Sequence, residues 1–396
     1  MYDFPMEKTL FDKLMRKIKH GGLTVKYWDG DVRTYGTADP YFGVEFTSAA
    51  ALRAMFRSLS LGFGEGYSKG TIKIDGNLEE IGRLLSENAS AFKSFQFIRL
   101  PQISQRNNKS TQKRQIQHHY DIGNDFYKLW LDESMLYSCA YFKHESDTLE
   151  QAQKQKIAHL LGKLQLQKGH RMLDIGCGWG NLLITAAKKY KVSGLGITLS
   201  EQQLKHARAT AKKEGVDHLV KFELRNFQDL GPDDGKFDRI ISVGMFEHVG
   251  RANFKTYYKT VHDRLVDGGV TVLHTITTDV EKGTDPWIDK YIFPGGLLPS
   301  TREIVWKTMD HGLFLTDYEN LRIHYALTLE EWRRRYNAHE KVITKKYGEE
   351  FYRMWDLWLA SSASGFRYGD LALGQFVFTK GNNNSLPLTR DALYKK

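Results

Sequence analysis

Apolar residues recur along this chain in patterns that separate a small N-terminal region from a larger one. In the first hundred residues, the runs LTVKYW, VRTYG, FGVEFTS and TIKIDG predict short strands, interrupted by glycine and aspartate. Helical spacing predicts helices over 8–19 and 49–59, and a further helix from Asn77, a suitable N-cap, toward Ala91. We therefore expect a small α+β module over residues 1–100.

The larger region, residues 118–380, alternates continuous apolar runs with helical segments. RMLDIG, VSGLGIT, VKFELR, DRIISV and GVTVLHTIT predict buried strands. GNLLITAAKKY and SEQQLKHARATAKKEG predict helices between the first of them, the second with Ser200 as its N-cap. QFVFTK (375–380) is expected to close the sheet as a late edge strand. This alternation is typical of a doubly wound parallel sheet.

Two polar stretches set the boundaries of these regions. Residues 101–117, PQISQRNNKSTQKRQIQ, are polar and aperiodic, which predicts a linker. The final stretch, residues 381–396, is rich in asparagine and is expected to be disordered. The predicted organisation is a module, a basic linker, a large α/β domain and a tail.

Composition places the chain among globular proteins. Its 396 residues are 41% hydrophobic and 26% charged, and no run approaches the ~20 apolar residues of a membrane-spanning helix. The first residues lack the features of a signal peptide, so we expect a cytoplasmic protein. The two cysteines, Cys139 and Cys177, form neither a disulfide framework nor a metal-type spacing.

The net charge of +10 favours polyanions such as nucleic acid or an anionic membrane surface. Residues 88–120 contain several basic residues and no acidic residue. The basic residues are Lys93, Arg99, Arg106, Lys109, Lys113 and Arg114. Either this stretch is a solvated linker with ordinary lysines, or it is a patch that docks on a membrane or on RNA.

The stretch LDIGCGWGNL carries a predicted strand into a predicted helix through a glycine turn. Its glycines are Gly176, Gly178 and Gly180. Glycine permits positive φ and a close approach of the backbone to a ligand. A dinucleotide site would need the spacing GxGxxG and an acid about 20 residues later, but Thr198 stands there. The pattern favours S-adenosylmethionine (SAM), with Asp174 organising the turn and holding the cationic part, and with Cys177 filling it. A dinucleotide site or a purely structural turn stays an alternative.

Several longer motifs resemble those of the cyclopropane fatty acid synthases and the related mycolic acid cyclopropane synthases. They are HHYDIGNDFYKLWLDESMLYSCAYF, LDIGCGWG, GITLSEQQ, SVGMFEHVG, LHTI and DPWIDKYIFPGGLLPS. The resemblance covers about residues 115–380, and the N-terminal module is similar to that of the branch that acts on phospholipids. It implies a Rossmann-like class I SAM-dependent methyltransferase sheet behind a smaller N-terminal α+β domain.

The activity implied by this resemblance is methylene transfer. SAM would donate a methyl group to a cis double bond of an acyl chain, the resulting carbocation would lose a proton to bound bicarbonate, and a cyclopropane ring would close. An olefin is a weak nucleophile, so such a site must orient the reactants and exclude water. Aromatic faces stabilise a cation without attacking it. The chain is rich in aromatic residues, at YSCAYF, WIDKYIF and FYRMWDLW, although such clusters are more often core.

The resemblance assigns a set of residues to the bicarbonate cage. They are Cys139, Glu247, His274, the backbone at Ile276, and Tyr325. Bicarbonate needs several donors and a carboxylate that accepts its hydroxyl hydrogen. We therefore expect Cys139 to support a small anion and not to act as a nucleophile. From the residues alone, Cys139 and His274 would belong to the core and Glu247 would be an acid at a helix start. Ser362 stands where many relatives carry a cysteine, which fits a non-covalent route.

A second set of residues is expected to contact the cofactor. They are Tyr137, Ser138, Asp174, Gly176, Cys177, Gly178, Gly180, Thr198, Gln203, Phe227 and Gln228. The mycolic acid relatives have Trp-Glu where this chain has Phe227 and Gln228. We expect Phe227 to cover the adenine face and Gln228 to bond its edge.

The expected substrate lies in a bilayer, so the protein must dock on a membrane. We expect phospholipid acyl chains at an anionic surface as partner, no nucleic acid, and a location at the inner face of the cytoplasmic membrane. Candidate docking surfaces are the N-terminal module, the segment after FPGGLLPS and the basic helix EEWRRRYNAHEKVITKKYG. That helix is alternatively a cover on the sheet with a solvated face. The resemblance further implies a homodimer.

Other functions remain open at this point. A small-molecule N-methyltransferase would share much of the domain, but the N-terminal module and the complete cage set argue against it. An RNA methyltransferase fits the basic charge, but no RNA-binding motif is visible. A lipid-binding protein without activity is disfavoured by the intact glycine turn. A close relative could methylate the olefin without closing the ring.

Overall fold

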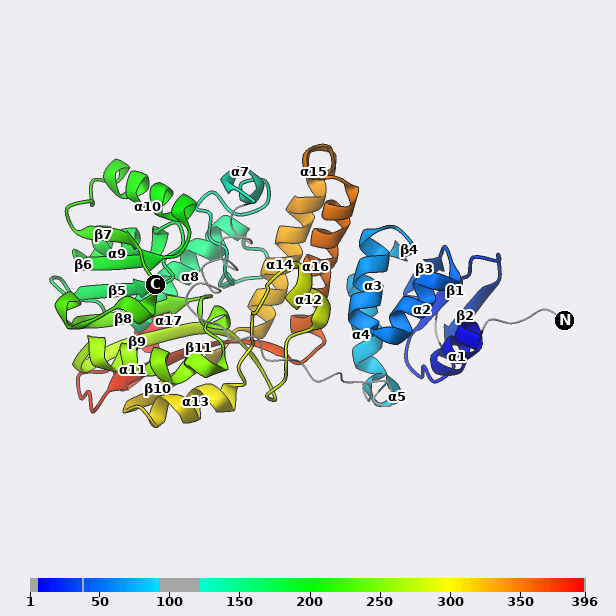
Figure 1. Ribbon diagram of the computed structural model, residues 1–396. Coiled ribbons are helices and arrows are strands. Elements are labelled where there is room, and N and C mark those ends of the chain that lie inside the picture. Colours follow the sequence, from blue (N-terminus) through cyan, green and yellow to red (C-terminus); the bar gives the residue numbers. More distant parts are fainter. Residues whose placement is uncertain (1–5, 38, 93–121, 395–396) are drawn as a thin grey trace. The chain divides into compact units, whose positions relative to one another are not determined.

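The computed structural model describes residues 6–37, 39–92 and 122–394 (Figure 1). Its residue contacts divide the chain into two compact units, and each is described by itself. Unit 1 comprises Met1–Ser104, Asp285–Ile292 and Leu329–Asp370, and unit 2 comprises Gln105–Thr284, Phe293–Thr328 and Leu371–Lys396. The basic linker predicted at 101–117 lies outside the described residues. Unit 1 therefore contains later segments that the sequence pattern assigned to the large domain.

The described part of unit 1 contains the predicted small sheet. Its strands are β1 (Gly22–Lys26), β2 (Val32–Gly36), β3 (Phe42–Phe46) and β4 (Ile72–Gly76), in the order β2-β1-β3-β4. β1 pairs antiparallel with β2 and parallel with β3, and β3 pairs antiparallel with β4. Val25, Phe46 and Leu52 are buried in its core. The four predicted strands are thus confirmed.

The helices of unit 1 come from distant parts of the sequence. They are α1 (Met6–Met15), α2 (Ala49–Arg57), α3 (Leu59–Ser68), α4 (Glu79–Glu87), α5 (Ala89–Phe92), α12 (Pro286–Tyr291), α15 (Glu340–Tyr347) and α16 (Glu349–Arg367). The glycine-rich run LSLGFGEGYS forms α3, to which the pattern assigned no element. A Cβ on Gly62 would lie 2.4 Å from the Ala54 carbonyl, and one on Gly64 would lie 2.3 Å from Trp287. Close packing therefore explains the glycines on this helix.

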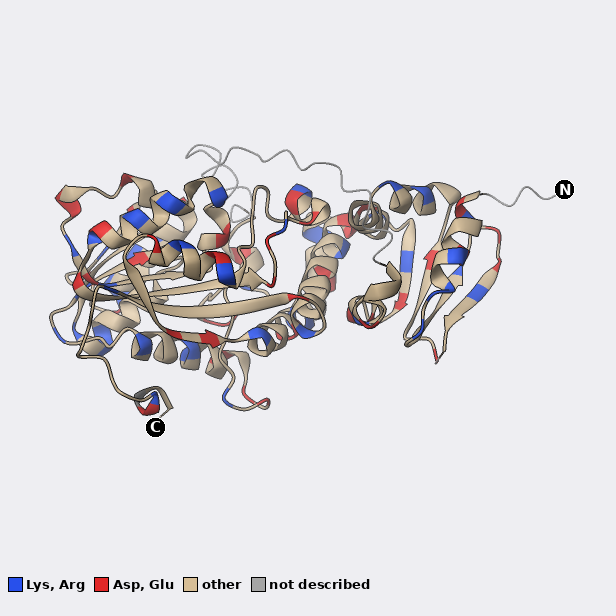
Figure 2. Cartoon of the chain, turned by 90° about the horizontal axis from the view of Figure 1, so that it is seen from below, with Lys and Arg blue, Asp and Glu red and all other residues tan. Residues whose placement is uncertain are grey.

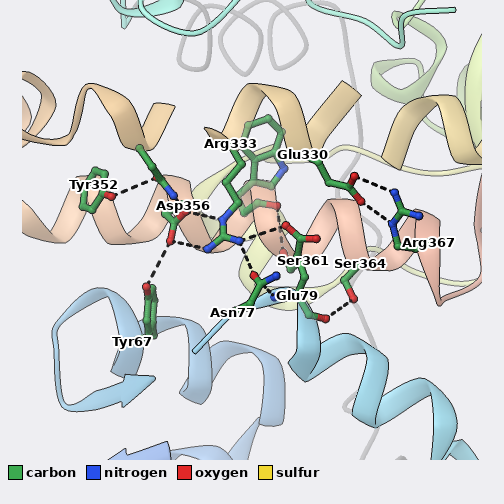
Figure 3. Close-up of polar contacts among 12 residues, drawn as sticks. Tyr67, Asn77, Glu79, Glu330, Arg333, Tyr352, Asp356, Ser361, Ser364 and Arg367 are labelled. Carbon is green, nitrogen blue, oxygen red and sulfur yellow. Dashed lines mark hydrogen bonds and ion pairs between the residues drawn. The ribbon is translucent and has the colours of Figure 1, made fainter. Parts of the chain in front are cut away.

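The basic segment predicted as one helix, EEWRRRYNAHEKVITKKYG, belongs to two helices, because the helical conformation is interrupted at His339. The first, α14 (Arg322–Ala338), begins in unit 2 and ends in unit 1, and the second is α15. Within unit 1, the Arg333 guanidinium donates to Asp356 Oδ1 at 2.7 Å and to Asn77 Oδ1 at 2.7 Å (Figure 3). It also donates to Glu79 Oε1 at 3.2 Å. We call these four residues the Arg333 cluster; it links α14, α16 and the start of α4.

The described part of unit 2 contains a seven-stranded sheet in the order β10-β11-β9-β8-β5-β6-β7. The strands are β5 (Arg171–Ile175), β6 (Ser193–Thr198), β7 (Val220–Leu224), β8 (Phe237–Val243), β9 (Leu265–Thr278), β10 (Leu313–Asn320) and β11 (Leu371–Lys380). Strands β5 to β9 pair parallel, whereas β11 runs antiparallel to both of its neighbours. The predicted α/β class is confirmed, with a mixed rather than wholly parallel sheet.

The position predicted for the last strand is wrong. β11 lies between β9 and β10 in the interior of the sheet, and β10, which the pattern did not predict, is the edge. Nearly every residue of β11 is buried on both faces, which is typical of an interior strand. β10 carries exposed residues such as Phe314, as an edge strand does.

Helices cover both faces of this sheet, with α9 and α10 on one side and α11 and α13 on the other (Figure 1). The helices of unit 2 are α7 (Asn124–Tyr127), α8 (Leu149–Lys163), α9 (Asn181–Tyr190), α10 (Glu201–Lys213), α11 (Phe254–Arg264), α13 (Thr301–Met309) and α17 (Asp391–Tyr394). Val377 packs with one layer, whereas Phe376 and Phe378 pack with the other. This alternation along β11 is the two-residue period of a strand. Ser200 caps α10 as predicted, accepting a hydrogen bond from the Gln203 amide at 3.4 Å.

The C-terminal stretch, predicted to be disordered, is ordered through residue 394. Asn383 donates to the Gly268 carbonyl at 2.6 Å, and Arg390 pairs with Asp317. Leu386 packs against the core of unit 2. These long-range contacts fix a segment whose polar sequence contains no local signal for order.

No helix among the described residues is long and apolar enough to cross a membrane.

Candidate active site

The glycine turn lies at the carboxyl end of β5, near the centre of the parallel strands. Gly176, Gly178 and Gly180 all have positive φ, at 84°, 54° and 88°. The amides of Gly176 and Cys177 both donate to the Ile197 carbonyl at the end of β6. A Cβ built on Gly178 would meet no described atom within 4 Å, so this residue faces open space. Ligands of α/β proteins bind where the strand order reverses, and this turn occupies that point.

A pocket opens beside the turn, with walls from the ends of β5, β6, β7 and β8. Most of the residues predicted to contact the cofactor line it. They are Tyr137, Ser138, Asp174, Gly176, Cys177, Gly178, Thr198, Gln203 and Phe227. Residues outside the prediction complete the walls, among them Lys156, Trp179, Asn226 and His248.

Gly180 and Gln228 are not among the wall residues, unlike the expectation from the sequence. Gly180 is the N-cap of α9, and a Cβ there would lie 2.8 Å from Ala207 Cβ. It therefore allows α9 to pack closely and does not contact the pocket. The Gln228 amide donates to Asn226 Oδ1 at 2.9 Å, in the short 3-10 helix η2 (Phe227–Asp229).

Polar groups gather at one end of the pocket. The Asp174 carboxyl is buried, and this burial raises its pKa to about 7, although nearby Lys156 opposes the shift. Thr198 Oγ1 donates to Gln203 Oε1 at 2.7 Å. Phe227, by contrast, is an apolar wall whose ring contacts Tyr257 edge-on. The pocket walls thus include both aromatic and ionisable side chains.

Lys156 is the most buried of the polar wall residues that sequence reasoning missed. It lies on α8, and its Nζ donates to Ser138 Oγ at 2.7 Å. Burial lowers its pKa to about 8, opposed by the charges of Asp132, Cys139 and Asp174. No local signal marked it, because α8 buries other polar residues as well, among them Gln153 and Lys163.

These walls fit SAM by their chemistry. Phe227 offers an aromatic surface for a purine, and the open backbone at Gly178 permits a close approach. A buried carboxyl, Asp174, suits a cationic group, and a buried ammonium, Lys156, suits an anionic group. The residues present therefore match a nucleoside that carries a zwitterionic amino-acid end.

Three of the predicted cage residues lie at the ends of β8 and β9. Glu247 is in the short 3-10 helix η4 (Phe246–His248), and its Oε1 accepts the Ile276 amide hydrogen at 2.8 Å. The Ile276 N–H is thus engaged by Glu247, although the sequence prediction made it a donor to the anion. His274 is almost fully buried and contacts Gln375 Nε2 through Nδ1 at 3.1 Å.

Two buried polar atoms of this cluster have no hydrogen-bond partner among the described residues. They are Glu247 Oε2 and His274 Nε2. Burial lowers the pKa of His274 well below its usual value, so its ring is neutral. With the Gln375 amide donating to Nδ1, the hydrogen is on Nε2. Burial also raises the pKa of Glu247. The cluster therefore presents one donor and one acceptor, both unused.

Cys139 is fully buried beside the pocket wall, directly after Ser138. Its Sγ donates to the Ala140 carbonyl at 3.2 Å, and burial raises its pKa far above the usual value. A neutral thiol is a poor nucleophile, which agrees with a supporting role. Thr328 on α14 accepts the Ala140 amide hydrogen at 3.0 Å. Tyr325 is half-buried on the same helix, three residues before Thr328.

Comparison with known proteins divides the chain near the predicted linker, so one family model includes the later segments of unit 1 as well as most of unit 2. Residues 107–376 match the family model described as mycolic acid cyclopropane synthetase. Residues 10–96 match a separate model described as a domain of unknown function.

Individual relatives cover most of the chain. It is 35% identical over 385 residues to a probable fatty acid methyltransferase of Pseudomonas putida, with 95% of this chain and 97% of that protein covered. It is 40% identical over 337 residues to the cyclopropane-fatty-acyl-phospholipid synthase of Escherichia coli K12, with 84% and 86% covered. A mycolic acid cyclopropane synthase crystallised with SAH and CTAB superposes with a TM-score of 0.64 at 34% identity, over 68% of this chain and 98% of that one. The glycine turn, the pocket and these matches together show that the chain belongs to the cyclopropane synthase family of SAM-dependent methyltransferases.

Proposed function

We propose that this protein transfers a methylene group from SAM to the cis double bond of an unsaturated acyl chain in a phospholipid, forming a cyclopropane ring. Membership of the cyclopropane synthase family supports the reaction. The names of the relatives from E. coli and P. putida, which refer to phospholipid and to fatty acid, support an acyl lipid as substrate. The observation that carries the proposal is the buried cluster of Glu247 and His274, whose unpartnered polar atoms could hold the base that removes a proton before the ring closes.

The site must orient a weak nucleophile and keep water away from a cation. SAM, when bound, supplies an electrophilic methyl group. The wall residue Tyr137 contacts the rings of Tyr127 and Trp130 at centroid distances of 5.4 Å each. Trp179, also in the wall, contacts Tyr127 at 5.8 Å. These rings hold one another in place, exclude water and offer π faces that stabilise positive charge without reacting.

The proton released from the new methyl group needs an acceptor that is not bulk water. We propose that bicarbonate supplies this base, held by the hydrogen of His274 Nε2 and by Glu247 Oε2, which accepts its hydroxyl hydrogen. The support is that both atoms are buried and unpartnered among the described residues, a state that is costly unless a ligand pairs with them. Cys139 and Tyr325 would complete the cage.

Access to the substrate requires contact with a membrane surface. We propose a peripheral protein at the inner face of the cytoplasmic membrane, attracted to anionic lipid by its net charge of +10. Lys and Arg are interspersed with Asp and Glu over both units in the view of Figure 2. On α14, Arg334 and Arg335 both pair with Glu331, which reduces the charge that this helix offers to lipid. The N-terminal module and the segment after FPGGLLPS stay candidate docking surfaces, and a homodimer remains part of the proposal.

Product analysis tests the proposed reaction. Purified protein is incubated with SAM and liposomes of cis-unsaturated phospholipid, and the released acyl chains are examined by mass spectrometry and proton NMR. We expect a gain of one CH₂ and the loss of the olefinic protons. A product that keeps an olefin as a methylene branch would instead indicate methylation without ring closure. Unchanged lipid, despite SAM binding, would favour a small-molecule amine as substrate.

Bicarbonate dependence tests the proposed base. In buffer depleted of carbon dioxide we expect turnover to fall and to recover on addition of bicarbonate. Glu247→Gln and His274→Ala should lower turnover without recovery, whereas Lys154→Met, an exposed change on α8, serves as a matched control. Folded Glu247 and His274 variants with full turnover would refute the cage.

A further inference from the structure

Lys156 is a buried cation whose hydrogen-bonding capacity is largely unused. Its exposed fraction is 1%, and its hydrogen-bond partner among the described residues is Ser138 Oγ alone, at 2.7 Å. An ammonium group has three donors, so two remain. No described carboxylate lies within 4.0 Å of its Nζ, although the charges of buried Asp132 and Asp174 act on it from further away. A buried charge is costly unless it is paired, so this residue needs an anionic partner.

The same pocket contains a buried carboxyl group, Asp174, that, like Lys156, forms no ion pair with a described residue. Asp174 is 2% exposed, and its carboxylate has no hydrogen bond from a described residue. Lys156 is the charged group that influences it. Both side chains line one pocket, so its walls hold two opposite charges that influence one another without forming an ion pair within 4.0 Å. The chemical group complementary to such a pair is a zwitterion, with a carboxylate at one end and an ammonium at the other.

We propose that Lys156 binds the α-carboxylate of the methionine end of the cofactor, while Asp174 takes its ammonium group; this rests on the proposed SAM-dependent reaction. Lys156 thereby becomes the residue that distinguishes the complete amino-acid end from a cofactor analogue that lacks the carboxylate. Gln153, one turn earlier on α8, donates to the Ser138 carbonyl at 2.9 Å. The helix thus fixes the wall segment around Ser138 and holds Lys156 at the pocket.

Bicarbonate also carries an anionic oxygen, so it is the alternative candidate for the anion that Lys156 binds. The charge of Lys156 acts on the cage residues His274 and Cys139, but Lys156 itself lines the cofactor pocket, whereas Glu247 and His274 are not among the residues of its walls. The position of Lys156 therefore favours the cofactor carboxylate over the anion of the cage.

Calorimetric binding of SAM and of decarboxylated SAM to the full chain separates these possibilities. We expect the wild-type protein to bind decarboxylated SAM at least about tenfold more weakly than SAM, because a charge-assisted contact is lost. Lys156→Met should weaken SAM binding by about tenfold to a hundredfold and leave decarboxylated SAM within about threefold. Lys154→Met, on the exposed face of the same helix, should change neither affinity.

Several results would overturn the inference. Equal wild-type affinities for the two ligands would refute it without any variant, which covers the case in which Lys156→Met fails to fold. Equal weakening of both ligands by the variant would indicate a structural role. A changed bicarbonate requirement in turnover, with SAM affinity unaltered, would assign Lys156 to the cage. Failure of the wild-type protein to bind SAM at all would instead refute the proposed function.

Discussion

Replacing Arg333 by methionine should destabilise unit 1 strongly, because the Arg333 cluster is built around one buried cation. The Arg333 side chain is 15% exposed and that of Asp356 is 8% exposed. Burial also raises the pKa of Glu79, which shows how little solvent reaches this cluster. Methionine would keep part of the packing of the arginine stem but none of its donors (Figure 3).

The magnitude follows from what remains after the change. Removing one partner of a buried ion pair costs about 3–5 kcal/mol, because the other charge is left without compensation. Asp356 Oδ1 would still accept a hydrogen bond from Asn337 Nδ2 at 3.0 Å. We therefore expect the low end of the range, about 3 kcal/mol. The neighbouring Arg334 is 69% exposed and pairs with Glu331 on the same helix, so Arg334→Met should cost below about 0.5 kcal/mol.

Hydrogen–deuterium exchange, read by mass spectrometry on peptides from α14 and α16, measures this difference. A loss of about 3 kcal/mol should accelerate exchange of the slowest amides by about two orders of magnitude in Arg333→Met. The matched variant Arg334→Met should exchange like the wild-type protein. Equal protection in the two variants, or a loss below about 1 kcal/mol in Arg333→Met, would refute the view that the cluster is a buried, charge-dependent joint.

Three further predictions concern the second unit. SAM affinity should peak between about pH 7 and pH 8. It should fall at lower pH, where Asp174, whose pKa burial raises to about 7, becomes protonated, and at higher pH, where Lys156, whose pKa burial lowers to about 8, loses its proton. Calorimetry at pH 6, 7.5 and 9 checks this, and a flat profile would contradict it. Gly180→Ala should cost about 2 kcal/mol in urea unfolding, because the new Cβ would be strained at φ +88° and would lie 2.8 Å from Ala207 Cβ on α10. Gly178→Ala should cost only about 1 kcal/mol, from the strain at φ +54°, because no described atom lies near its Cβ, and it should also weaken SAM binding. Equal losses of stability in the two variants would refute the distinction. The free energy of unfolding should fall as the pH drops below about 6.5, because His274 is protonated in the unfolded chain but stays neutral in the folded protein, where burial lowers its pKa. His274→Gln should reduce the slope of unfolding free energy against pH by up to about 1.4 kcal/mol per pH unit. An unaltered slope would exclude the histidine as its source.

Local sequence patterns predicted the elements that carry the cofactor site. The run RMLDIG became β5, Ser200 caps α10, and the glycine turn lies beside the pocket as expected. These features depend on residues close together in the chain, so periodicity and capping were sufficient. The motif-based prediction that Tyr137 and Ser138 would join Asp174 came from the family resemblance and could not have followed from spacing.

Features that depend on distant contacts escaped prediction. The glycines of α3 are explained by packing against Trp287, more than two hundred residues later. The position of β11 in the sheet was predicted wrongly because strand order depends on the whole sheet. The continuous apolar run QFVF was nevertheless consistent with a strand that is buried on both faces. Lys156 looked like an ordinary helix lysine, since only the folded structure reveals that it is buried and lines the same pocket as Asp174. The amide of Ile276 was assigned to an anion because the sequence does not reveal that Glu247 accepts it first.

The most direct measurement uses SAM with a trideuterated methyl group, cis-unsaturated phospholipid liposomes and the purified full-length chain. If a methyl group is transferred to the olefin and then loses one hydrogen as the ring closes, each product chain gains one carbon and two deuterium atoms and has no olefinic protons. Retention of all three deuterium atoms in the lipid, or of an olefin in the product, would contradict ring formation by this protein.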